Sequence, residues 1–166
     1  DGFFWMIMGA YGIAITTFAG QNFGARRYDR VKKSVGVCLG MSAGTAVVIS
    51  TAYCLFALPL LHIFSGDAAV LQIGRQIVYT VVPFNITYVC IEILAGAIRG
   101  CGEALPPMLL VAGGVCVLRL VWIFSVLPFR RELSTVLISY PLSWAATSVL
   151  FVIYYLRGGW LKRCIR

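Results

Sequence analysis

The sequence predicts an all-α polytopic membrane protein, a bundle of five transmembrane helices. Of its 166 residues, 60% are hydrophobic and only 12% are charged, about half the share of charge in a soluble globular chain. Three stretches, 2–25, 34–66 and 133–156, contain no Asp, Glu, Lys or Arg. Each exceeds the ~20 mostly apolar residues that a spanning helix needs. A water-soluble core cannot absorb so much apolar length in so short a chain.

The first two predicted spans come from the first two charge-free stretches. The first covers about 2–23 and is followed by a basic loop at 26–33. The second covers about 34–64 and ends at Ser65-Gly66-Asp67, a combination typical of a turn. We therefore expect a helical hairpin whose connecting loop carries positive charge.

Prolines help to delimit the remaining three spans. The third covers about 76–98 and contains Pro83. The fourth covers about 106–127; it begins with Pro106-Pro107, which suit the first turn of a helix, and stops at Pro128. The fifth covers about 134–156 and leads into a basic tail with Trp160 at the predicted membrane interface.

The basic residues predict how the bundle is oriented. The 26–33 loop, Arg99 and the tail after Leu156 together hold ten of the fourteen Lys and Arg residues, and the opposite side of the predicted bundle holds three. Loops rich in Lys and Arg face the cytoplasm, which predicts a cytoplasmic C-terminus. An odd number of spans that begins outside predicts a C-terminal piece of a longer chain.

Several function classes lack their sequence signals. The single histidine, His62, excludes a two-histidine zinc site and argues against a His-based catalytic triad, and no phosphate-binding glycine loop is present. The six cysteines form no C-x-x-C pair. The basic residues form short clusters between apolar runs, which indicates topology signals and not a nucleic-acid surface. We expect no enzyme, no metal site, no cofactor and no nucleic-acid partner.

Glu92 is the candidate for ion coupling. It lies six residues before the end of the third span, or about 10 Å into the membrane at 1.5 Å per residue. A carboxyl group at this depth is costly and by default marks an ion pathway. Asn85, Tyr88, Glu92 and Arg99 share one helix face. The alternative is a structural carboxyl group hydrogen-bonded between helices.

Arg119 is a second intramembrane charge. It lies about 20 Å from the cytoplasmic end of the fourth span, against about 10 Å for Glu92, so we expect no direct contact between the two. Arg119 would instead bind backbone carbonyls or extend outward past Trp122. A structural role and a functional role both remain open.

Two further stripes have structural and functional interpretations. Gly36, Gly40 and Gly44 predict a face of the second span that another helix approaches closely. In the fifth span, Tyr140 begins a polar stripe that continues through Ser143. That stripe either lines a cavity for aromatic cations or forms an ordinary helix interface.

Four motifs in this order resemble the multidrug and toxic compound extrusion (MATE) family of transporters. The first is GQNFGA at 20–25, followed by a basic segment with Tyr28 and Arg30. The second is EILAGAIRGCG at 92–102, followed by Pro106-Pro107. The others are GVCVLR at 114–119 with Trp122, and SYPLSW at 139–144. Together they cover nearly the whole chain.

The resemblance implies a twelve-helix transporter with two lobes, of which this chain supplies helices eight to twelve. The missing N-terminal lobe would then be its partner in the same chain. Family members exchange H⁺ or Na⁺ for drugs and toxic organic compounds, which implies a multi-pass protein of the bacterial plasma membrane. In several branches the acidic residue of helix ten lies at the position of Tyr88, and here Glu92 follows one turn later on the same face.

The predicted mechanism assigns roles to four residues. Glu92 would bind the coupling ion, and Asn85, Tyr88 and Tyr140 would offer polar and aromatic surface to a drug or organic cation. Two rival hypotheses are a flippase for lipids or polysaccharide precursors, which several inward arginines would favour, and a non-transporting membrane interaction subunit.

Overall fold

The computed structural model of the chain describes residues 2–157, and within them it confirms the all-α membrane bundle. Five helical segments are long and apolar enough to cross a bilayer: Gly2–Gly24, Tyr28–Leu55, Ala68–Gly100, Leu105–Val126 and Leu133–Leu156. The predicted basic tail with Trp160 lies outside the described residues, apart from Arg157.

The first two helices form a hairpin with a much shorter connection than predicted. Helix α1 covers Gly2–Gly24 and α2 covers Tyr28–Leu55, so most of the expected 26–33 loop is the start of α2. Arg26 turns the chain with a positive φ of 57°. Charged residues interrupt the apolar run but not the helix, because a helix that leaves the bilayer continues in water with its charges solvated.

The predicted second span, 34–64, is interrupted at Phe56. Helix α2 ends at Leu55, and a short helix, α3, covers Ala57–His62. Pro59 explains the break, because a proline has no N–H and its ring clashes with the carbonyl four residues earlier, which here belongs to Leu55. The predicted second span is therefore divided into α2 and the short helix α3.

The third segment begins eight residues before its predicted start. Helix α4 covers Ala68–Val81, a 3₁₀ turn, η1, covers Val82–Phe84, and α5 covers Asn85–Gly100. The Asp67 carboxylate accepts a hydrogen bond from the Ala69 amide at 2.9 Å, which caps the start of α4. Pro83 lies in the 3₁₀ turn that joins α4 to α5.

The fourth and fifth segments lie within one residue of their predicted bounds. The fourth comprises α6 at Leu105–Val111, a π-helical segment, η2, at Ala112–Val117, and α7 at Leu118–Val126. The fifth is a single helix, α8, at Leu133–Leu156. The π-helical segment was not expected from the sequence. Gly114 within it packs directly against the Thr147 side chain of α8.

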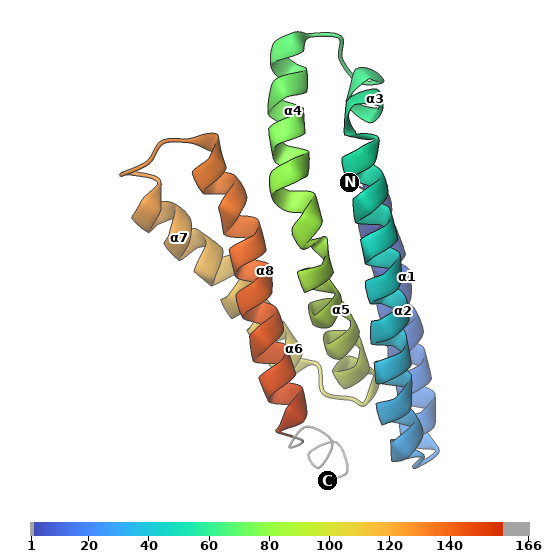
Figure 1. The fold of residues 1–166 in the computed structure, drawn as a ribbon. Helices are drawn as coiled ribbons and strands as arrows, with labels where there is room; N and C mark the ends of the chain where they lie inside the picture. Colours follow the sequence, from blue (N-terminus) through green and yellow to red (C-terminus); the bar gives the residue numbers. More distant parts are fainter. Residues whose placement is uncertain (1, 158–166) are drawn as a thin grey trace.

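Helix α5 lies at the centre of the bundle and contacts α1, α2 and α8, while α6, η2 and α7 pack along α8. Figure 1 shows the helices alternating in direction. The α1–α2 connection, the end of α5 and the end of α8 therefore lie at one end of the bundle. This alternation matches the predicted topology and brings the 26–33 segment, Arg99 and Arg157 to the same end.

Candidate functional site

The backbones of α1 and α5 approach each other closely through glycine. A Cβ on Gly96 would lie 2.9 Å from the Gly12 carbonyl oxygen, and one on Gly20 would lie 3.0 Å from the Gly100 carbonyl oxygen. A Cβ on Gly100 would collide with the carbonyl of Thr16. Small residues spaced in this way allow close packing, which is a main source of helix association in lipid.

The predicted glycine stripe of α2 does not have this role within residues 2–157. A Cβ on Gly36, Gly40 or Gly44 would meet nothing within 4 Å. Within residues 2–157 the close approach belongs to α1 and α5. A close approach of another helix to the α2 stripe stays a prediction.

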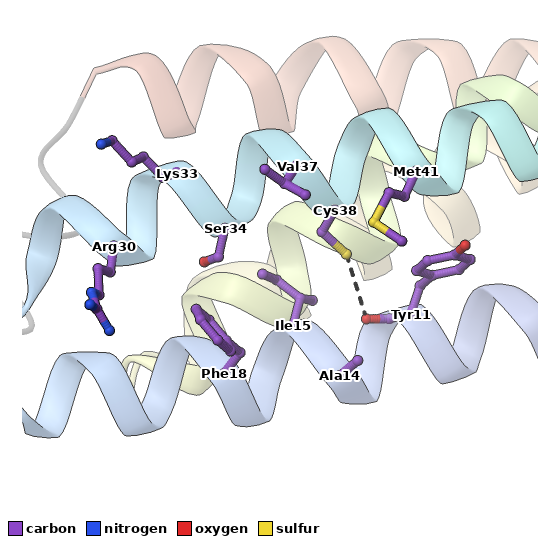
Figure 2. Close-up of a pocket in the computed structure, with 10 residues that line it drawn as sticks. All are labelled: Tyr11, Ala14, Ile15, Phe18, Arg30, Lys33, Ser34, Val37, Cys38 and Met41. Carbon is purple, nitrogen blue, oxygen red and sulfur yellow. Dashed lines mark hydrogen bonds between the residues drawn. The ribbon is translucent and has the colours of Figure 1, made fainter.

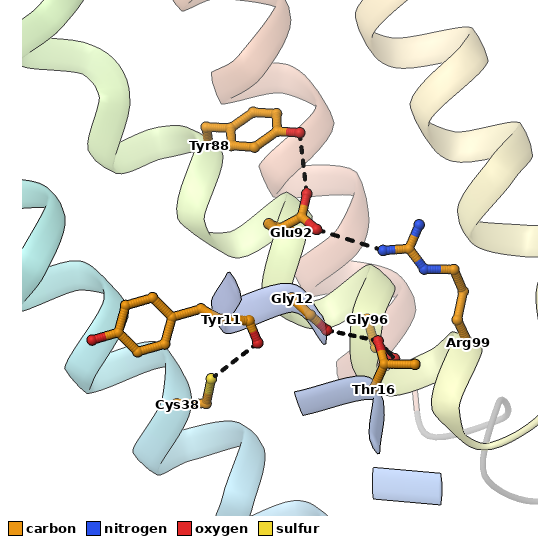
Figure 3. Close-up of polar contacts among 8 residues, drawn as sticks. All are labelled: Tyr11, Gly12, Thr16, Cys38, Tyr88, Glu92, Gly96 and Arg99. Atoms are coloured by element: carbon orange, nitrogen blue, oxygen red, sulfur yellow. Dashed lines mark hydrogen bonds and ion pairs between the residues drawn. The ribbon is translucent and has the colours of Figure 1, made fainter. Parts of the chain in front are cut away.

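The Thr16 hydroxyl of α1 stabilises the close contact between α1 and α5. It lies 2.7 Å from the Gly12 carbonyl oxygen and 3.0 Å from the Gly96 carbonyl oxygen, so it bridges the two helices (Figure 3). Because no water reaches such groups in a bilayer, an interhelical hydrogen bond of this kind helps to fix the register of α1 on α5.

Glu92 extends from α5 into this contact. Its Oε2 accepts a hydrogen bond from the Tyr88 hydroxyl at 3.2 Å, and its Oε1 lies 3.6 Å from Nη2 of Arg99 (Figure 3). The carboxylate packs directly against Gly12 of α1. The Glu92 side chain is 21% exposed and that of Arg99 is 47% exposed. The site is thus a mostly buried carboxylate with a hydroxyl donor on one oxygen and a loosely held cation on the other.

Tyr88 also belongs to an aromatic cluster formed by Trp5, Tyr88, Tyr140 and Trp144. The Tyr88 ring lies 4.7 Å from the Trp5 ring and 5.9 Å from the Trp144 ring, both edge to face. Tyr140 continues the cluster, with its ring centre 5.9 Å from that of Trp144. Edge-to-face contacts at these separations are favourable. The cluster joins α1, α5 and α8 next to the carboxylate.

Arg119 lies at the far side of this cluster. Its guanidinium carbon is 4.0 Å from the centre of the Tyr140 ring, and its Nη2 donates a hydrogen bond to the Ser143 hydroxyl at 3.1 Å. Its Nε is buried and has no hydrogen-bond partner among the described residues. Arg119 therefore contacts an aromatic ring and a hydroxyl group of α8, where backbone carbonyls were expected. Glu92 pairs with Arg99 and not with Arg119, as the difference in depth predicted.

The three predicted cavity residues lie in different surroundings. Asn85 is completely buried, and neither polar atom of its side chain has a hydrogen-bond partner within residues 2–157. Tyr88 is partly buried beside Glu92, and Tyr140 is exposed. The structure brings Tyr88 and Tyr140 into one aromatic cluster and leaves Asn85 in the interior. A role of these residues in a substrate cavity stays a prediction.

The sequence contained a signal for one missed contact and none for the others. Arg99 shares a helix face with Glu92 two turns away, so the ion pair could have been inferred from spacing. Gly12, Thr16 and Trp5 come from a different helix, and nothing in their local sequence indicates where they pack. Among residues 2–157 no group of three or more His, Cys, Asp or Glu side chains is placed to hold a metal ion.

Five helical segments apolar enough to cross a membrane, with the Glu92 carboxyl group mostly buried between two of them, define a multi-pass membrane protein with an ionisable group in its interior. The chain belongs to the MatE family, whose sequence profile matches residues 1–124.

Curated relatives agree with this assignment. The chain is 29% identical over 164 residues to "Probable multidrug resistance protein NorM" of Aromatoleum aromaticum, covering 97% of this chain and 35% of that protein. It is 28% identical over 161 residues to a Thermotoga maritima protein with the same name, covering 95% and 35%. It is 26% identical over 157 residues to "Probable multidrug resistance protein YoeA" of Bacillus subtilis, covering 93% and 33%. The chain spans about a third of the length of these relatives.

Proposed function

We propose that this chain forms the C-terminal lobe of an antiporter that exports drugs and toxic organic compounds across the bacterial plasma membrane in exchange for H⁺ or Na⁺. Its helices would be the eighth to twelfth of twelve, and the N-terminal lobe would complete the central cavity. Membership of the MatE family and the names of the three relatives support export of drugs. The predicted cytoplasmic C-terminus is part of the same proposal.

The placement of Glu92 is the observation that carries the proposal. A carboxylate in a membrane helix requires compensation of its charge, and Arg99 supplies it only through a contact of 3.6 Å. Binding of a proton or Na⁺ to Glu92 neutralises the carboxylate and removes the attraction for Arg99. Because Glu92 also packs against Gly12, such a change acts directly on the contact between α1 and α5.

Tyr88 provides a route from the ion to the drug. Its hydroxyl is hydrogen-bonded to Glu92 and its ring contacts Trp5 and Trp144. Neutralising Glu92 weakens the hydrogen bond, since bonds to a charged acceptor are the stronger ones, and allows the Tyr88 ring to rearrange. Antiport follows if the ion and the drug stabilise opposite conformations of the lobe. Tyr88 and Tyr140 would then contact the drug.

The test compares Glu92→Gln with Glu132→Gln in the complete transporter. Glutamine keeps the size and hydrogen-bonding capacity of Glu92 but cannot be charged or exchange a proton. Glu132 is an exposed carboxylate in the connection before α8, so Glu132→Gln controls for the loss of one negative charge. Drug efflux is measured in proteoliposomes with an imposed H⁺ gradient and, separately, with an imposed Na⁺ gradient.

We expect Glu92→Gln to reduce efflux to the rate measured without a gradient, at a protein level equal to that of the wild type, while Glu132→Gln retains gradient-driven efflux. The gradient that drives the wild type identifies the coupling ion. Undiminished gradient-driven efflux in Glu92→Gln would place the ion site elsewhere. Wild-type proteoliposomes that translocate labelled lipid but no drug would favour the flippase, and inactivity with both would favour the non-transporting subunit.

A further inference from the structure

A groove with one charged end runs along the surface between α1 and α2. It encloses about 520 Å³. Its apolar walls come from α1 and α2, and two basic side chains of α2 line it at one end (Figure 2). The basic side chains are Arg30 and Lys33, and the apolar walls include Phe18, Val37 and Met41. This groove is separate from the Glu92 site and from the aromatic cluster.

The groove is held open by contacts between its two helices. At the end opposite Arg30, the Tyr11 hydroxyl and the Thr45 hydroxyl are hydrogen-bonded at 2.9 Å. The Cys38 thiol lies 4.0 Å from the Tyr11 carbonyl oxygen (Figure 2). Because these contacts join α1 to α2, they fix the relative position of the two helices that form the groove.

The apolar walls face outward. Phe18, Val37 and Met41 are large hydrophobic side chains that remain exposed in the structure. From Arg30 to Met41 the groove follows α2 for about 16 Å at 1.5 Å per residue. A small anion from the aqueous phase would use only the basic end and would leave this apolar length uncovered.

Within residues 2–157 no carboxylate pairs with the two cations at the basic end of the groove. Within residues 2–157 the ion pair present is that of Arg99 with Glu92, and neither Arg30 nor Lys33 has a carboxylate within 4.0 Å. Both side chains are exposed and belong to the first two turns of α2. Helix α2 begins at the end of the bundle where α1 connects to it (Figure 1). This is also the end predicted to face the cytoplasm, whose leaflet carries the anionic lipids.

We propose that this groove binds one anionic phospholipid, with the phosphate between Arg30 and Lys33 and an acyl chain along Phe18, Val37 and Met41. The two parts of the groove match the two parts of such a lipid, because a basic pocket between membrane helices recognises an anionic head group and an apolar wall accommodates the chain. A transmembrane helix of the transporter would cover the walls but would leave the two cations without an anion.

Native mass spectrometry of the complete transporter tests the head-group contact. The protein is released from detergent with phosphatidylglycerol or phosphatidylcholine, and the bound lipid is counted. We expect Arg30→Gln with Lys33→Gln to lower the affinity for phosphatidylglycerol about thirtyfold, given the contribution of each basic side chain near an anionic surface. The matched control is Arg26→Gln with Lys32→Gln, which removes the same charge from the same segment outside the groove lining and should retain the lipid.

A second pair of variants tests the acyl-chain contact. Val37→Trp fills the groove, and Val48→Trp introduces the same side chain at an exposed position of α2 outside it. We expect Val37→Trp to abolish retention of phosphatidylglycerol and Val48→Trp to leave it intact. Each protein is first shown to be monodisperse, so that a loss of lipid is not a loss of folding.

Four results would overturn the proposal. They are an equal loss in the Arg26/Lys32 control, equal binding of phosphatidylcholine, unchanged binding in Val37→Trp, and full displacement of the lipid by inorganic phosphate. A variant whose sole cysteine is Cys38 adds a readout that does not depend on counting lipids. We expect a thiol reagent to label it in detergent and phosphatidylglycerol to protect it. Absence of labelling without lipid would show that a helix of the transporter covers the groove.

Discussion

The two halves of the bundle are packed to very different extents. In the most apolar stretch of the α4–α5 segment, 61% of the residues are buried inside the chain, whereas in the corresponding stretch of the α6–α7 segment the share is 6%. Both stretches are apolar enough to cross a membrane. The difference shows that α5 makes its helix contacts within residues 2–157, whereas these residues leave most of the α7 surface uncovered.

The two halves also hold their intramembrane charges differently. Glu92 lies in the densely packed half, where its carboxylate touches the backbone of α1 and pairs with Arg99. Arg119 lies in the sparse half, where it stacks on the Tyr140 ring and bonds to Ser143 of one neighbouring helix. A change at Glu92 therefore acts on a helix interface, whereas a change at Arg119 acts mainly on the attachment of α7 to α8.

The largest contrast is expected between truncating a buried large side chain of α8 and truncating an exposed one of α7. Trp144 is 3% exposed and Phe124 is 75% exposed. Trp144→Ala should lower the free energy of unfolding of the complete transporter by about 3–5 kcal/mol, the usual cost of removing a buried large aromatic side chain. Phe124→Ala should change it by less than about 0.5 kcal/mol. Unfolding by denaturant in detergent micelles measures both, and equal losses would show that Phe124 of α7 is as buried as Trp144 of α8.

A smaller contrast is expected from adding one methyl group to a glycine in each half. Gly100→Ala places a Cβ against the Thr16 backbone, and Gly113→Ala places one in open space. Overpacking against backbone should cost about 1–3 kcal/mol. Alanine at position 113 should be neutral or slightly stabilising, since glycine disfavours helices by about 1 kcal/mol relative to alanine. Size-exclusion chromatography after heating compares the two, and an unchanged Gly100→Ala would contradict the close approach of α1 and α5.

The smallest effect concerns the ring under Arg119. Tyr140→Leu removes the aromatic face and should lower stability by about 1 kcal/mol, within the range of cation–π contacts. Tyr140→Phe keeps the face and should be nearly neutral. The same chemical unfolding experiment compares them. Equal losses in the two variants would assign the effect to the Tyr140 hydroxyl and remove the cation–π contact from the account of α7.

The sequence was sufficient for the number and order of the membrane helices but not for all of their ends. Charge-free runs identify what must lie in lipid, and for the fifth segment the helix ends where its run ends. The fourth segment contains Arg119, and its ends are marked by the flanking prolines. At 28–33 and 68–75 the helices continue through polar residues. A charge marks where the bilayer stops, and it does not mark where the helix stops. Phe56 is the opposite case, since Pro59 ends α2 within an apolar run.

The candidate site was predictable along one helix and not across two. Helical spacing places Tyr88, Glu92 and Arg99 on one face of α5, and the structure shows both flanking residues in contact with the carboxylate. Gly12 and Thr16 complete the site from α1, some eighty residues earlier in the chain. Local periodicity holds no information about which helix packs against which. For the same reason the glycine stripe of α2 did not indicate that the close contact within residues 2–157 lies between α1 and α5.

The π-helical segment at Ala112–Val117 has a consequence for the angular phase of the fourth helix. Such a segment accommodates about one residue more than an α-helix of the same rise, and one residue corresponds to about 100° of rotation. Every side chain after Val117 is therefore rotated relative to a regular helical wheel drawn from Pro106. The direction in which Arg119 extends from α7 therefore depends on the π-helical segment. Deleting one residue there would restore the regular wheel and turn the guanidinium away from Tyr140 without altering either side chain.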